Sequence, residues 1–302
     1  MRMFMDPTYD FIFKRLFGSN DHIHLSKSFI NALCRFKGKD KVETVKFLNQ
    51  EQLPGNTEIR LGKTTVDIYC ENQWGHKFIV EMQRAPETDF VQRLMLYFSR
   101  MYASQYEPTF NFEELYPVIV IAVALKIPAL KHKKSYRSMH VMHDEETHER
   151  DIKEIGFVLI ELDKFCKQQD DLVTDEDKWL FLLKTIGSAR EVPEALETGL
   201  FKEACDLLNL MKMDKMVRME YENTEALLQS LENTKRDEEI RVKAEGRAEG
   251  RAEGKAEGKA EGIAEGEHKA KLELARNLLA EKMSVELIAK LTGLSVEEIQ
   301  KL

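Results

Sequence analysis

Two short segments of the sequence each carry an acidic residue among strand-forming residues. Asp67 lies in TTVDIYC at 64–70, and Glu81 lies with Gln83 in KFIVEMQ at 77–83. β-branched and aromatic residues dominate both segments, which is typical of strands. The intervening ENQWGH contains the Asn and Gly that favour a tight hairpin loop. The sequence therefore predicts a β-hairpin with Asp67 and Glu81 on adjacent strands.

The lengths of the strands and of the loop set the register of this hairpin. If the loop is symmetric about Trp74, six apolar residues pair on one face: Val66 with Met82, Ile68 with Val80, and Cys70 with Phe78. Because side chains alternate along a strand, the same register places Asp67 opposite Glu81 on the other face, with Gln83 beside them. We therefore expect one apolar face and one polar, solvent-facing face.

Two opposed carboxylates define the chemistry that this hairpin could perform. Their Cβ atoms would lie roughly 5 Å apart, and like charges at that separation are destabilising unless a cation compensates them. Carboxylate oxygens suit Mg²⁺, with Mn²⁺ or Ca²⁺ as alternatives, and such a metal can activate water for phosphodiester hydrolysis. The pattern predicts Asp67 and Glu81 as metal ligands and Asp67, Glu81 and Gln83 as the catalytic group. Spacing by itself is more typical of ordinary charges on a half-exposed hairpin.

The elements around the hairpin must hold it in a larger sheet. Amphipathic helical patterns precede and follow it, and continuous apolar runs further on are typical of buried strands. In chain order, the sequence predicts helices near 13–17 and 25–33, strands at 42–49, 64–70 and 77–83, a helix at 89–106, strands at 118–125 and 156–162, and helical structure throughout 173–235. The order α-β-β-β-α-β predicts an α/β fold, with a mixed sheet flanked by helices and a helical C-terminal extension.

Basic and polar residues outside the catalytic group are candidates for DNA contact. They are Lys63, Arg93, Tyr97, Lys131, Lys133 and Lys134. Arg93 and Tyr97 share one face of the predicted long helix. Lys63 stands four residues before Asp67 on the same strand face, where it could supply a positive charge. The other lysines belong to a loop-like basic stretch at 126–137 that suits phosphate binding, although helix-to-sheet contacts and ordinary solubilising lysines explain these residues as well.

Composition and charge are compatible with a DNA partner. The 302 residues are 43% hydrophobic, enough for a core, and the net charge of −8 is unevenly distributed, since residues 1–131 hold 17 Lys and Arg against 15 Asp and Glu. The four cysteines stand far apart without a C-x-x-C pair, which argues against a zinc knuckle and a disulfide framework. No segment has the pattern of a membrane span or signal peptide, so we expect a cytoplasmic protein without a membrane partner.

The C-terminal part changes character twice. Residues 243–266 form six tetrapeptides ending in Ala-Glu-Gly, which predicts a marginal helix or a flexible spacer. Small residues at this spacing would also let two helices approach closely. Residues 267–302 regain a helical core pattern, and SVELIAKLTGLSVEEIQKL resembles a short helix-turn-helix without a basic recognition face. Homo-oligomerisation through this helical region is therefore a second expectation.

Several separated blocks of the sequence resemble one protein family. DPTYDFIFKRLFG, LGKTTVDIYCENQWGHKFIVEMQ, DFVQRLMLYFSRMYASQ and YPVIVIAVAL are similar, in the same order, to the bacterial recombination-promoting nucleases, also described as transposase-like PD-(D/E)XK nucleases. The resemblance spans most of residues 6–126 and implies a restriction-endonuclease-like core whose D…E-x-Q motif falls on Asp67, Glu81 and Gln83. It also implies metal-dependent cleavage of double-stranded DNA with little sequence specificity, linked to recombination.

Two positions depart from the pattern of the wider superfamily. The third motif residue there is usually Lys, whereas Gln83 carries no charge, although it can hydrogen-bond water or a phosphate oxygen. The first core helix there often adds an acid, whereas residues 22–36 contain none. Asp10 and Asp21 are the nearest acids, and the sequence does not favour either.

The chain is thus predicted to have four parts and one of two functions. The parts are a nuclease-like domain at 1–165, a helical extension at 166–242, a repeat linker at 243–266 and a small helical module at 267–302. The leading hypothesis is a Mg²⁺-dependent endodeoxyribonuclease linked to recombination or mobile-element activity. The alternative is a nuclease-fold DNA-binding or regulatory protein with weak or no catalysis. Plasmid cleavage that depends on metal and on Asp67 separates the two.

Overall fold

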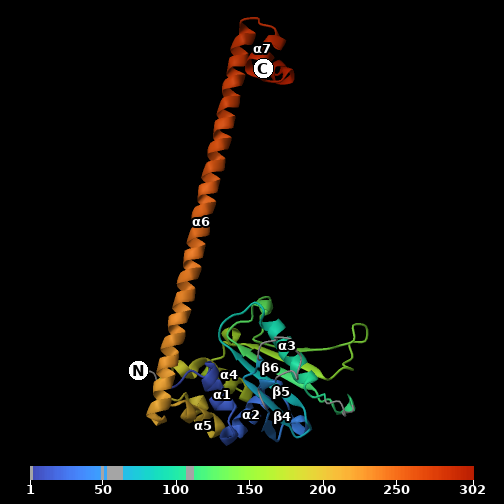
Figure 1. The fold of residues 1–302 in the computed structure, drawn as a ribbon, viewed down its shortest axis with the longest axis vertical. Helices are drawn as coiled ribbons and strands as arrows, with labels where there is room; N and C mark the ends of the chain where they lie inside the picture. The colour runs from blue at the N-terminus through green and yellow to red at the C-terminus, as the bar shows by residue number, and fades with distance from the viewer. Residues whose placement is uncertain (1–2, 49–50, 53–63, 107–111) are drawn as a thin grey trace. The chain divides into compact units, whose positions relative to one another are not determined.

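The computed structural model describes residues 3–48, 51–52, 64–106 and 112–302 (Figure 1). Contacts divide the chain into two compact units, Met1–Tyr221 and Glu222–Leu302. The first unit contains the sheet and the residues predicted to do chemistry, and the second is helical. Among the described residues, no helix is both long enough and apolar enough to cross a membrane.

A six-stranded mixed sheet forms the centre of the described part of the first unit. Its strands are β1 (Val45–Phe47), β4 (Ile68–Asn72), β5 (Lys77–Gln83), β6 (Val118–Ala124), β7 (Arg137–Val141) and β8 (Ile155–Glu161). They lie in the order β1-β4-β5-β6-β8-β7, with β5, β6 and β8 parallel and the remaining neighbours antiparallel. β2 (Glu51–Gln52) and β3 (Thr64–Thr65) form a separate ladder.

Helices cover both faces of the sheet (Figure 1). On one side lie α1 (Asp10–Phe17), α2 (Ile23–Cys34), α4 (Asp175–Thr185) and α5 (Gly199–Leu208), and on the other lies α3 (Phe90–Ala103). The apolar side of α1 is buried, and its Phe17 stacks on Phe29 of α2 with ring centroids 4.2 Å apart. The same ring meets Trp179 of α4 edge-on. The predicted α/β fold, a mixed sheet flanked by helices, is confirmed.

The face covered by α3 has its own core. Phe90, Leu94 and Met101 of α3 belong to one buried cluster with Tyr69 of β4 and Ile79 of β5. The cluster continues across the sheet through alternate residues of β6 and β8. Because both faces of these strands are covered, β6 and β8 are apolar without alternation. The hairpin that carries the predicted catalytic group therefore lies between two layers of helices.

The second unit consists of helices. It contains most of α6 (Lys215–Ala280), together with α7 (Val285–Thr292) and α8 (Val296–Gln300). The repeat at 243–266 is helical within α6, although each Gly destabilises a helix by about 1 kcal/mol relative to Ala. A small core joins the last turns of α6 to the two short helices: Ala275, Ile288, Leu294 and Ile299. Gly293 ends α7 in a left-handed conformation, with φ of 72°.

Two predictions of local structure are wrong, and one strand of the sheet was not predicted. The strand predicted at 64–70 is interrupted at Val66 and Asp67, because β3 pairs with β2 and only β4 joins the main sheet. β7 has no counterpart among the predicted strands, since its residues lack the alternation that would indicate one. Residues 173–235 are not helical throughout, because the chain leaves the helical conformation between α4 and α5 and again before α6.

Candidate active site

The β4–β5 hairpin has the register predicted from the sequence. Two of the predicted pairs lie in its ladder: Ile68 with Val80, and Cys70 with Phe78. Gly75 in the connecting turn has a φ of 80°, a left-handed conformation that glycine adopts without strain. Because β4 begins only at Ile68, Asp67 stands one residue before the ladder. This position determines what the Asp67 carboxylate contacts.

Where the backbone ladder ends, the two carboxylates become the hydrogen-bond acceptors. The backbone N–H of Asp67 donates to Oε1 of Glu81 at 3.1 Å, and the backbone N–H of Met82 donates to Oδ2 of Asp67 at 2.8 Å. Each carboxylate therefore binds the main chain of the strand that carries the other. The two acids are held together by the hairpin backbone, which is the kind of positioning that a preorganised site needs.

Both carboxylates are buried. Asp67 retains 8% of its possible exposure and Glu81 retains 6%. The prediction of a solvent-facing side was wrong, because the next residues on that face, Tyr69 and Ile79, lie in the core beneath α3. The alternation within the hairpin could not reveal a helix that packs on it from a later part of the chain.

The first helix brings a third acid and a lysine to this pair. Nζ of Lys14 lies 2.8 Å from Oδ1 of Asp10 and 3.3 Å from Oδ1 of Asp67, and Asp10 also shares a hydrogen bond with Asp67. The sequence pattern does not distinguish Asp10 from Asp21, and it does not indicate Lys14 as part of the site. One signal was available, since Asp10 and Lys14 stand at i and i+4 opposite the apolar side of α1.

The side chain of Arg84, next to the motif, binds the segment that leads into α1. Arg84 directly follows Gln83, and its Nη1 donates to Oδ2 of Asp6 and to Oγ1 of Thr8, both at 2.8 Å. The guanidinium also lies over the ring of Tyr9, 4.4 Å from the centroid. The strand that carries Glu81 thus fixes the start of α1. This contact explains why Asp10 and Lys14 reach a hairpin more than fifty residues later.

The positive charges near the acids do not fully balance the negative charges that the acids would carry when ionised. Burial, followed by the hydrogen bond with Asp10, raises the pKa of Asp67 to about 7. Burial and then the charge of Asp67 raise the pKa of Glu81 well above its ordinary value. Burial also acts on Asp10, but hydrogen bonds with Asp67 and Lys14 hold its pKa below the ordinary value. At neutral pH, protons compensate part of the charge on this cluster.

Gln83 connects the motif to α3. Its Oε1 accepts a hydrogen bond from Nη2 of Arg93 at 2.5 Å, and its Nε2 donates to the carbonyl of Ala85 at 2.8 Å. Arg93 also pairs with Glu87, and its positive charge partly opposes the rise in the pKa of Glu81 that burial and Asp67 cause. The Gln83 amide therefore positions a guanidinium beside the carboxylates. This contact joins helix to sheet and also brings a cation to the site.

The other predicted DNA contacts differ in their placement. Tyr97 is half-buried beside the cluster, where burial and then the charge of Glu81 raise its pKa. Lys63 lies outside the described residues. The three lysines of the basic stretch follow the short helical turn η4 (Pro128–Leu130), on the connection that leaves β6. Since β5 and β6 are parallel, this connection starts at the edge of the sheet where Gln83 ends β5.

The chemistry of the donor set fits a hard divalent cation. Within the residues that the structure describes, no three His, Cys, Asp or Glu side chains are grouped closely enough to hold a metal by themselves. Mg²⁺ does not require such a cage, because it keeps several waters and is commonly held by one or two carboxylates together with phosphate oxygens. Asp67 and Glu81 would supply those carboxylates, and Asp10 lies beside them.

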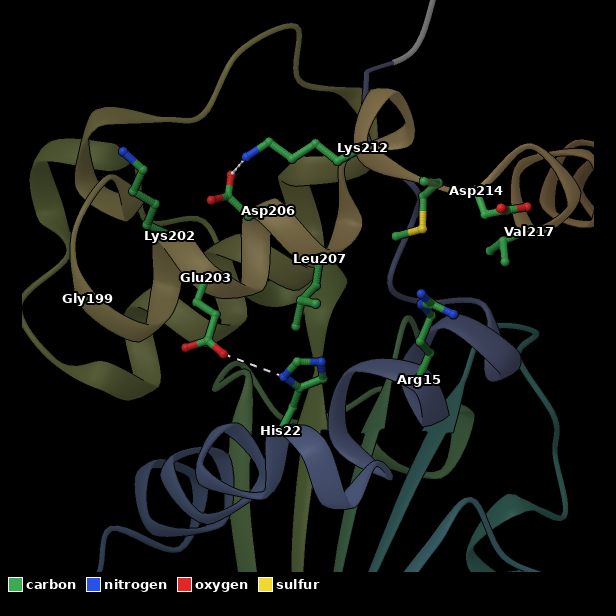
Figure 2. A pocket seen from close by; sticks show the side chains of 11 residues that line it. Arg15, His22, Gly199, Lys202, Glu203, Asp206, Leu207, Lys212, Asp214 and Val217 are labelled. Atoms are coloured by element: carbon green, nitrogen blue, oxygen red, sulfur yellow. Dashed lines mark hydrogen bonds and ion pairs between the residues drawn. The ribbon is translucent and has the colours of Figure 1, made fainter.

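A separate cavity in the first unit lacks this chemistry. It encloses about 550 Å³ between α1 and the α5 region (Figure 2). Two contacts between ionisable side chains lie within it: Nζ of Lys212 is 2.8 Å from Oδ1 of Asp206, and Nδ1 of His22 is 3.5 Å from Oε1 of Glu203. The side chains of Glu203 and Asp206 in this cavity are 43% and 38% exposed, whereas Asp67 and Glu81 are buried, so the hairpin is the stronger candidate site.

Comparison with protein families agrees with the blocks of resemblance noted in the sequence. Residues 7–238 match the model described as PD-(D/E)XK nuclease family transposase. Residues 268–302 match the C-terminal helix-turn-helix domain of the Rpn/YhgA-like nuclease family. No curated protein and no solved structure matches the chain significantly. Because the first match covers well over half of the 302 residues, the chain belongs to the PD-(D/E)XK nuclease family transposases.

Proposed function

We propose that this protein is a Mg²⁺-dependent endodeoxyribonuclease that hydrolyses phosphodiester bonds in double-stranded DNA at the Asp67–Glu81 site. The observation that supports this most directly is the buried pair of carboxylates, flanked by Asp10 and by the cations Lys14 and Arg93. Buried acids in such proximity are costly unless a cation joins them. A divalent cation bound between them would also serve the hydrolysis of a phosphodiester bond.

In this proposal each residue has a defined role. Asp67 and Glu81 would hold the metal, which when bound supplies Lewis-acid activation of water and of the scissile phosphate. Lys14 and Arg93 flank the pair on two sides, from α1 and α3, and would bind phosphate oxygens or stabilise developing negative charge. Gln83 orients Arg93 through its amide oxygen. The positive charge that a motif lysine would carry is thus provided by other elements.

The biological setting is part of the same proposal. The family description names transposases, which supports a role in recombination or in the activity of a mobile element. The helix-turn-helix match supports DNA as the partner. Lys14 and Arg93 suit phosphate oxygens, and phosphate contacts carry no base information, so we expect cleavage with little sequence preference. Self-association through the second unit stays a prediction, and light scattering coupled to size exclusion would measure it.

Nicking of supercoiled plasmid tests the assignment. The full-length protein should convert plasmid to open circles with Mg²⁺ or Mn²⁺ and not with EDTA, and the variants Asp67→Asn and Glu81→Gln should lose this activity. Asp21→Asn is the matched control, because it removes the same charge from an exposed residue of the N-terminal region. Equal nicking by wild type and Asp67→Asn would show that the activity comes from a contaminant or from another site.

A non-catalytic DNA-binding or regulatory protein is the second candidate function. It is favoured by the engagement of the Gln83 amide at both ends, with Arg93 and with the carbonyl of Ala85. Both ends of the amide are therefore held by protein groups, and only one donor and one acceptor position remain for water. Retained DNA binding without cleavage in Mg²⁺, Mn²⁺ and Ca²⁺ would favour this candidate over the nuclease.

A further inference from the structure

Three strand ends lie in one row at the edge of the sheet that carries the candidate site. In the parallel register, Gln83 of β5 pairs with Ala124 of β6, and Ala124 pairs with Glu161 of β8. Neighbouring strands are about 4.8 Å apart, so the backbones of Gln83 and Glu161 are roughly 10 Å apart. Aligned residues of parallel strands face the same way, and Glu161 is therefore on the same face of the sheet as Gln83. The connection that follows Ala124 begins between them.

Glu161 is a buried acid that binds this connection. It is only 4% exposed, and its Oε1 accepts a hydrogen bond from the backbone N–H of Ile127 at 3.0 Å. Its Oε2 pairs with Lys164, whose Nζ donates in turn to the carbonyl of Leu130 at 2.9 Å. Ile127 and Leu130 are themselves buried in the core beneath α3. The carboxylate and the lysine thus fix both sides of the short turn η4.

The anchored connection presents three lysines within four residues. Lys131 and Lys134 are exposed and Lys133 is half-buried, and among the described residues none of the three has a carboxylate partner. The backbone N–H of Lys133 donates to the carbonyl of Leu130 at 2.9 Å, which ties the lysines to the anchored turn. Like charges on a fixed backbone repel one another, and a polyanion would relieve that repulsion. Ordinary solubilising lysines do not need a buried ion pair beneath them.

We infer that residues 126–134 form a binding element for the phosphate backbone of duplex DNA, next to the scissile position, and that Glu161 is the positioning residue that holds it there. The inference rests on the proposed nuclease function for its partner. Lysine contacts to phosphates carry no base information, so this element raises affinity without sequence preference. Glu161 acts through Ile127 and Lys164 and does not itself contact the DNA.

The salt dependence of DNA binding tests this inference. Affinity of the full-length protein for a labelled 30-bp duplex is measured in CaCl₂ over a series of KCl concentrations. Each phosphate contact contributes a slope of about −0.9 to the plot of log affinity against log salt. Replacing Lys131, Lys133 and Lys134 together with Gln should therefore flatten the slope by up to about 3. Glu161→Gln keeps an acceptor for Ile127 but loses the ion pair, and it should flatten the slope by about 1.

A second lysine cluster provides the matched control. Lys37, Lys39 and Lys41 are exposed, and replacing them with Gln makes the same change in net charge. They lie at the other end of the hairpin, because the carbonyl of Lys41 accepts a hydrogen bond from Gln73 in the β4–β5 turn. The control should leave the slope close to that of the wild type. Thermal melting of each variant identifies any loss of folding, which would lower the melting temperature without changing the slope.

The outcomes separate this inference from the proposed activity. An unchanged slope in the Lys131, Lys133 and Lys134 variant, or an equal change in the control, overturns the binding element even if nicking still depends on Asp67. A flatter slope in that variant and in Glu161→Gln supports the element even if no nicking is found. An effect of Glu161→Gln on melting alone would assign that residue a purely structural role and overturn its positioning role.

Discussion

Replacing Asp67 with Asn should stabilise the metal-free protein at alkaline pH while abolishing its proposed activity. The pKa of the Asp67 carboxyl is raised from an ordinary value of 3.8 to about 7, first by burial and then by Asp10. Each unit of difference corresponds to about 1.4 kcal/mol, so ionising Asp67 in the folded protein costs about 4 kcal/mol. Asn removes that cost, because its amide oxygen can accept the Met82 N–H and its NH₂ group can donate to Asp10.

The pH dependence gives this prediction its sign. Below about pH 4, Asp67 is protonated in both the folded and unfolded chains and contributes no difference. As the pH rises from about 4 to about 7, the unfolded chain releases this proton before the folded chain does, so the stability of the wild type falls relative to that of the variant. The free energy of unfolding of Asp67→Asn should exceed that of the wild type by roughly 2 kcal/mol at pH 5 and by about 4 kcal/mol at pH 8.

Urea unfolding in EDTA at pH 5 and pH 8 measures the difference in the free energy of unfolding between Asp67→Asn and the wild type. Fluorescence of Trp179, which is fully buried in the core of the first unit, reports on the unit that contains the site. Asp21→Asn is the control and should show no gain at either pH. Added Mg²⁺ should stabilise the wild type more than the variant and narrow the gap, since binding to the folded state alone adds stability. A gain for Asp67→Asn that is the same at pH 5 and pH 8 would refute the electrostatic argument.

Three further outcomes are expected. Lys14→Gln should slow plasmid nicking roughly a hundredfold, because it removes a cation beside the scissile phosphate. Gln83→Lys added to Lys14→Gln should restore part of the nicking rate, and Lys14→Arg should retain most of it. Nicking at limiting Mg²⁺ should rise roughly tenfold per pH unit below about pH 7 and level off above it, because the proton on Asp67 competes with the metal; a flat profile from pH 5.5 to pH 8 would contradict this. Gly250→Ala and Gly254→Ala should each stabilise α6 by about 1 kcal/mol, since an added Cβ meets open space at both positions, and thermal melting followed by circular dichroism would measure the gain.

Local patterns in the sequence were enough to predict the hairpin and most of its sheet. The alternation around Trp74 placed Ile68 opposite Val80, and the predicted strand at 77–83 has the bounds of β5. These features depend on residues close together in the chain, where turn chemistry and side-chain alternation determine the outcome.

Features that depend on distant segments could not be predicted in the same way. The burial of Glu81 depends on α3, and the placement of Lys14 depends on the ion pair between Arg84 and Asp6. The interruption at Asp67 arises because its N–H finds the Glu81 carboxylate, a side chain, in place of a backbone carbonyl. Sequence alternation predicts which residues share a face, but it does not predict what later covers that face.

The charges gathered at the site explain why its protons and its proposed metal have the same role. Asp10, Asp67 and Glu81 would carry three negative charges if all were ionised, against two cations, of which Arg93 is also shared with Glu87. A proton on Asp67 reduces this excess near neutral pH, and a divalent ion would remove it altogether and leave the site able to accept a phosphate. A neutral Gln83 is consistent with this balance, because Lys14 and Arg93 already bring the positive charge that the motif lacks. The motif read by itself therefore underestimates the positive charge of the site, since both cations come from helices outside the hairpin.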